Sequence, residues 1–82
     1  MADNTEEREA GKTYLTNKIA SISNLSGDNL SWNHPLNKDG YELIVTSGGK
    51  QVIYEVSAMD LIDPKRRRQL DEYANDIARE FS

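Results

Sequence analysis

The densest charge cluster of the sequence is a run of four consecutive cations: Lys65, Arg66, Arg67 and Arg68. This basic cluster follows Asp63-Pro64, a helix-capping residue followed by a proline suited to the first helical position. We therefore expect the basic cluster in the first turn of a helix, where free backbone N–H groups and the helix dipole already present positive charge. Such a turn suits a phosphate or a group of carboxylates. The alternative is a solvated run of charge whose aliphatic stems cover the edge of the core.

The other residues that could do chemistry form weaker patterns. Glu42 and Glu55 could be a carboxylate pair for general acid–base work, but a repelling surface pair is the preferred interpretation. His34 lies in a polar turn, where we expect a loop histidine that can join the basic cluster in binding an anion or a partner. The segment 11–13, Gly-Lys-Thr, resembles the end of a phosphate-binding loop, but position 6 holds Glu where that loop needs glycine.

Residue types that build reactive or metal-binding sites are scarce. The chain has no cysteine and one histidine, which excludes disulfide scaffolds, thiol catalysis and zinc sites built from cysteines. We therefore predict a non-enzymatic protein without cofactor or metal.

The composition is just sufficient for a folded core. Leu, Ile, Val and Phe provide 17 of the 82 residues, slightly more than the roughly 20 % below which strongly charged chains are disordered. A chain of this length has room for one core, so we predict a single domain over residues 1–82, with residues 1–4 frayed.

A helix is predicted over the N-terminal third. Leu15 and Ile19 recur at helical spacing, and Asn4 is a candidate N-cap. Gly11 argues against the helix, because an interior glycine costs about 1 kcal/mol relative to alanine. The Ser-, Asn- and Gly-rich segment 21–29 should end it.

The middle of the chain predicts a three-stranded sheet. A short strand around Leu30 and Trp32 precedes a β-hairpin, in which Gly48-Gly49 forms a two-residue turn between segments 41–47 and 50–56. The turn fixes the cross-strand pairs of the inner face: Ser47 with Lys50, Val45 with Val52, Leu43 with Tyr54 and Tyr41 with Val56.

The same register places Ile44 opposite Ile53 on the other face of the hairpin. Two isoleucines outside the main core indicate a partly covered face or a contact surface. We therefore name them as the apolar centre of a predicted partner-binding face.

The last third is predicted to be helical. Ser57 and Asp60 form a capping-box pattern over a short turn, and a helix starting at Pro64 carries one apolar stripe. The predicted fold is thus a small α+β domain of order α-β-β-β-α. Its three-stranded antiparallel sheet should carry both helices on one face.

This order resembles the double-stranded-RNA-binding domain in two respects. That family also has the order α-β-β-β-α, and it places a basic cluster at the start of its last helix, as Lys65–Arg68 would be here. His34-Pro35 lies between the first two strands, where that family contacts a minor groove. The resemblance implies binding of duplex RNA or another nucleic acid, whereas the net charge of −4 opposes it.

The charges are segregated along the chain. Residues 1–9 carry −3, 10–63 carry −2, 65–68 carry +4 and 69–82 carry −3. Such segregation favours oriented docking on another protein. The first hypothesis is therefore a small regulatory interaction protein, acting as an adaptor, an inhibitor or a regulatory subunit. Nucleic-acid binding is the alternative.

The sequence contains neither a signal peptide nor an apolar run long enough to span a bilayer. We therefore predict a cytoplasmic location without membrane contact. Because a small core leaves little stability to spare, a homodimer is also expected, paired through a strand edge or through Ile44 and Ile53.

Overall fold

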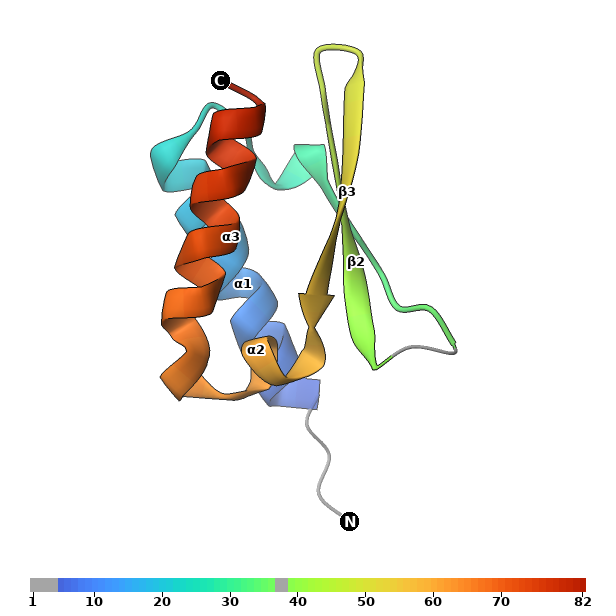
Figure 1. Cartoon of the computed structure of the whole chain (residues 1–82), viewed down its shortest axis with the longest axis vertical. Helices are drawn as coiled ribbons and strands as arrows, with labels where there is room; N and C mark the ends of the chain where they lie inside the picture. The colour runs from blue at the N-terminus through green and yellow to red at the C-terminus, as the bar shows by residue number, and fades with distance from the viewer. Residues whose placement is uncertain (1–4, 37–38) are drawn as a thin grey trace.

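The computed structural model describes residues 5–36 and 39–82. Its elements, in chain order, are α1 (Thr5–Ile22), the 3₁₀ turn η1 (Gly27–Asn29), β1 (Leu30–Asn33), β2 (Gly40–Ser47), β3 (Lys50–Ser57), α2 (Ala58–Ile62), the 3₁₀ turn η2 (Pro64–Arg66) and α3 (Arg67–Glu80). The strands form one antiparallel sheet in the order β1-β2-β3. Figure 1 shows the sheet nearly edge-on, with all three helices on one side of it. The predicted α+β fold is confirmed. The expected Asn4 cap and the fraying of residues 1–4 lie outside the described residues.

The hairpin has the register that its turn predicts. Tyr41 pairs with Val56, Leu43 with Tyr54, Val45 with Val52 and Ser47 with Lys50. The backbone angle φ is 59° at Gly48 and 80° at Gly49. These are left-handed values, which a two-residue turn needs and which glycine adopts without steric cost.

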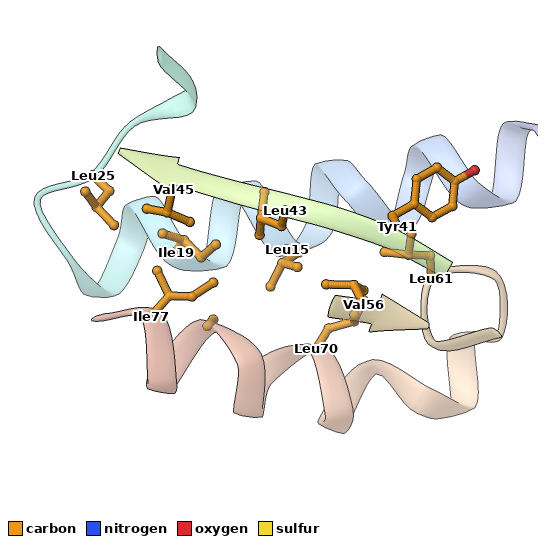
Figure 2. Packing of buried hydrophobic residues seen from close by; sticks show 11 residues of the cluster. Leu15, Ile19, Leu25, Tyr41, Leu43, Val45, Val56, Leu61, Leu70 and Ile77 are labelled. Carbon is orange, nitrogen blue, oxygen red and sulfur yellow. The ribbon is translucent and has the colours of Figure 1, made fainter. Parts of the chain in front are cut away.

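The core lies between the inner face of the sheet and the helices (Figure 2). Leu43 and Val45 of β2 pack with Leu15 and Ile19 of α1 and with the buried stripe of α3. That stripe has the helical spacing expected from the sequence, and its fully buried members are Leu70, Ala74 and Ile77.

The entry to the last helix differs from the expectation. The Ser57 hydroxyl accepts a hydrogen bond from the Met59 N–H and caps α2, and the Asp63 carboxylate accepts one from Lys65 N. However, Pro64–Arg66 form a 3₁₀ turn and α3 begins at Arg67. The basic cluster therefore spans two elements, and its cations point to different surroundings.

Candidate interaction surface

The outer face of the sheet presents an apolar pair. Ile44 of β2 lies directly opposite Ile53 of β3, as predicted. Because side chains alternate across a strand, both point away from the core residues Leu43 and Val45. The helices lie on the other side of the sheet (Figure 1), so Ile53 remains 53 % exposed and Ile44 is half-buried between its neighbours.

Polar residues surround this pair in an ordered way. Towards the hairpin turn the next pair is Thr46 with Gln51, which is neutral. In the opposite direction the next pair is Glu42 with Glu55, and Asn33 of β1 donates a hydrogen bond of 2.9 Å to Glu42 Oε1. The outer face therefore has an apolar centre, one neutral flank and one acidic flank.

A hollow of about 330 Å³ adjoins the acidic flank. Its lining includes the carboxylates of Glu42 and Glu55 together with Tyr41, Val56 and Tyr73. The carboxylates give the lining a negative charge, so the hollow favours basic groups.

Arg66 of the basic cluster belongs to the structural framework. Its Nη1 lies 3.3 Å from Oδ1 of Asp60, a residue with only 5 % exposure. The Tyr73 hydroxyl donates to Oδ2 of the same carboxylate at 3.2 Å. Burial of the ring and the Asp60 charge raise the pKa of Tyr73. Arg66 thus neutralises a buried carboxylate that ties α2 to α3.

Arg67 is engaged in the same region. Its Nη1 donates to the carbonyl oxygen of Leu61 at 3.2 Å, and its guanidinium lies 5.1 Å from the centre of the Tyr14 ring. The Tyr14 hydroxyl in turn donates to Asp71 Oδ1 at 2.8 Å, and this hydrogen bond raises the pKa of Tyr14. Arg67 therefore joins α1, α2 and α3.

Lys65 and Arg68 are exposed, as Arg66 is, but they lack its ion pair. Neither side chain forms an ion pair with any residue in the described ranges 5–36 and 39–82. Of the four cations expected to face an anion, these two are available for an external one.

His34 lies at the end of β1 and stacks on Tyr41, with ring centres 4.4 Å apart and planes 26° apart. The ammonium of Lys12 lies 4.4 Å from the centre of the same Tyr41 ring, and Trp32 meets that ring edge-on. Within the described part of the chain, no hydrogen bond, ion pair or ring contact joins His34 to Lys65–Arg68. Tyr41 is buried, as its predicted place on the inner face of the hairpin requires.

Sequence reasoning placed neither Asp60 nor Lys12 in these clusters. Asp60 had a weak signal, because it is the one charged residue in the apolar segment 58–62. Lys12 had none, since its aromatic contacts, Trp32 and Tyr41, lie 20 and 29 residues further along the chain.

The described residues lack two kinds of feature. They contain no group of three or more His, Cys, Asp or Glu side chains arranged to hold a metal ion. Among the same residues, no helix combines the length and hydropathy that a membrane span requires.

The fold and this surface define a small α+β domain with helices on one sheet face and an open opposite face. Comparison with protein-family models, with curated proteins and with solved structures gives no significant match.

Proposed function

We propose that the protein is a non-catalytic protein–protein interaction module, an adaptor, inhibitor or regulatory subunit, that docks through the outer face of its sheet. The observation that carries the proposal is the direct cross-strand pairing of Ile44 with Ile53 on an uncovered face. An exposed apolar centre with a polar rim is the usual composition of a protein-binding site.

The acidic flank adds a preference for the partner. Glu42 and Glu55 lie beside the isoleucines, and the adjoining hollow has the same two carboxylates in its lining. A partner with an apolar residue next to lysine or arginine would complement this face, because opposite potentials orient the encounter.

The basic cluster lies on a different part of the molecule. Arg66 and Arg67 bind groups of the helical layer, whereas the two isoleucines face away from that layer. A flat partner that covers Ile44 and Ile53 therefore leaves Lys65 and Arg68 uncovered. The docking surface consequently comprises the apolar centre and its acidic flank, and the basic cluster serves only to orient the encounter.

The test is affinity capture from the source cells by the immobilised protein. Replacing both Ile44 and Ile53 with Ser should abolish capture of the specific partner, while circular dichroism remains that of the folded protein. The matched control replaces Thr46 and Gln51 with Ala on the same face and should retain capture. Equal capture by both double variants would contradict the proposal.

A second candidate function is duplex-RNA binding through the basic cluster, and the exposure of Lys65 and Arg68 favours it. Its test is a salt titration with generic duplex RNA, because phosphate contacts weaken steeply as salt increases. Binding at low salt that disappears when Lys65 and Arg68 are both replaced with Ser would support this function. Absence of binding at low salt would exclude it.

A further inference from the structure

The free edge of β3 is the longest unpaired strand edge in the described sheet. β3 has eight residues and only β2 beside it, whereas the other edge strand, β1, has four. Long exposed edges are normally blunted by a proline, a bulge or inward-pointing charge. β3 has no proline and pairs continuously with β2 from Lys50 to Ser57, so it has no bulge. The one charge on its inner face, Lys50, lies at the turn end and leaves the rest of the edge open.

The hairpin turn determines which backbone groups face this edge. In a two-residue hairpin the pair that flanks the turn, here Ser47 and Lys50, is hydrogen-bonded, and the bonded pairs then alternate along the ladder. The N–H and C=O groups of Gln51, Ile53 and Glu55 are therefore directed outwards. The side chains of these three residues are also exposed.

We propose that the β3 edge pairs with the β3 edge of a second copy of this chain, antiparallel and about a two-fold axis at Ile53. A two-fold axis perpendicular to the sheet places the inner faces of the two copies on the same side. Directly opposite residues then point to the same face of the sheet, so their residue numbers add up to an even number. The register about Ile53 pairs this residue with its own copy. It also places Gln51 opposite Glu55 and Val52 opposite Tyr54.

The side-chain pattern selects this register and this occupant. Ile53 meets its own copy and Val52 meets Tyr54, while Lys50 lies opposite Val56. No like charges lie directly opposite each other, which would be unfavourable. A register shifted towards Ser57, about Tyr54, would pair Ile53 with Glu55, and one shifted towards the turn, about Val52, would pair it with Gln51. The charge nearest the turn, Lys50, is already held by the carbonyl oxygen of Glu80 at 2.9 Å and by the Glu80 carboxylate. The edge is thus complementary to itself.

The pairing would also extend the outer face. Ile44 and Ile53 of one copy would continue into Ile53 and Ile44 of the other, as one apolar row across the four central strands of a six-stranded sheet. This inference deepens the proposed function, since it doubles the apolar centre that docks on a partner. Self-pairing is measured on the purified protein without any partner, so the two proposals can fail independently.

The experiment is sedimentation equilibrium of the purified chain and of variants at the axis. The native chain should sediment at twice its mass of 9.3 kDa. Ile53→Lys and Ile53→Glu should each sediment at the single mass, because like charges then meet at the axis. An equimolar mixture of the two variants should return to the double mass. Thr46→Lys, on the same face of the central strand β2, should remain at the double mass.

A second variant tests the backbone bonds separately. Gln51→Pro removes an N–H that points to the free edge and leaves the ladder with β2 intact, since proline is tolerated at such positions of edge strands. It should sediment at the single mass with an unchanged circular dichroism spectrum. A native chain that remains at the single mass up to about 1 mM, the concentration at which even very weak pairing is half-formed, would overturn the proposal. A mixture of the charged variants that fails to pair would overturn the register.

Discussion

Gly11 of α1 lies directly against the backbone of Leu61 in α2. A β-carbon at position 11 would lie 2.3 Å from the Leu61 carbonyl oxygen and 2.7 Å from its Cα. The two helices therefore approach each other more closely than any other residue type would permit. The same carbonyl oxygen accepts a hydrogen bond from Arg67, so this crossing also positions the entry to α3.

Gly11→Ala should consequently destabilise the protein, although alanine is the better helix former. The higher helix propensity of alanine is worth about 1 kcal/mol. Overpacking costs about 1–3 kcal/mol. The atoms that would have to move here belong to the backbone of α2 and not to the end of a flexible side chain. Urea unfolding followed by circular dichroism measures the difference. Gly27→Ala is the control, because a β-carbon there meets nothing within 4 Å and should change the free energy of unfolding little. A stabilised Gly11→Ala variant would contradict the close crossing.

The four cations of the basic cluster should differ in their effect on stability. Asp60→Ala is expected to cost about 1–3 kcal/mol, because it leaves the Tyr73 hydroxyl and Arg66 without their partner. Arg66→Ala and Arg67→Ala should also lower the urea midpoint, whereas Lys65→Ala and Arg68→Ala should leave it nearly unchanged. Equal effects of the four alanine variants at positions 65–68 would contradict this division of the cluster.

The hairpin and the apolar stripe of α3 could be predicted from the sequence because two independent features of the sequence agreed in each. In the hairpin, the Gly48-Gly49 turn and the alternation of Leu43 and Val45 require the same register, and that register is observed. In α3, the apolar spacing agrees with a nearby capping residue, Asp63. The helix nevertheless begins at Arg67, because Pro64–Arg66 close a 3₁₀ turn first.

The division of the basic cluster could not be predicted in the same way. Adjacent arginines are chemically identical in a sequence, and only tertiary contacts give Arg67 the carbonyl oxygen of Leu61 and the ring of Tyr14. Gly11 illustrates the same limit. The sequence indicated that a glycine at this position destabilises the helix, but it did not indicate that α2 packs against it. Cross-strand contacts with a regular repeat, such as Ile44 with Ile53, were predictable because a turn fixes them.

The two turn glycines should respond differently to substitution. Gly48→Asn is expected to be tolerated, since asparagine adopts positive φ and Asn-Gly is a favoured pair for this kind of turn. Gly49→Val should destabilise by about 1–2 kcal/mol, because a branched residue is strained at a φ of 80°. Thermal unfolding of the two variants measures this asymmetry. A Gly48→Asn variant as unstable as Gly49→Val would indicate a different turn.

Tyr54 should make the protein sensitive to alkaline pH. Burial raises its pKa, and the carboxylates of Glu80 and Asp76 raise it further. A tyrosine with a raised pKa binds its proton more tightly in the folded state, so its contribution to stability is complete below the unfolded pKa of about 10 and is lost as the pH rises above that value. The free energy of unfolding should therefore fall above about pH 10.

The variant Tyr54→Phe distinguishes the alkaline loss of stability from the contribution of the Tyr54 hydroxyl to stability at neutral pH. The Tyr54 hydroxyl is buried and has no hydrogen-bond partner in the described part of the chain, so its removal should raise the free energy of unfolding by about 1 kcal/mol at pH 7. It should also reduce the alkaline loss, as urea midpoints at neutral and alkaline pH would show. Tyr73→Phe is the control, because the Tyr73 hydroxyl is bonded to Asp60. That variant should lose stability at pH 7 while likewise reducing the alkaline loss, and a stabilised Tyr73→Phe would contradict the role of the bond to Asp60.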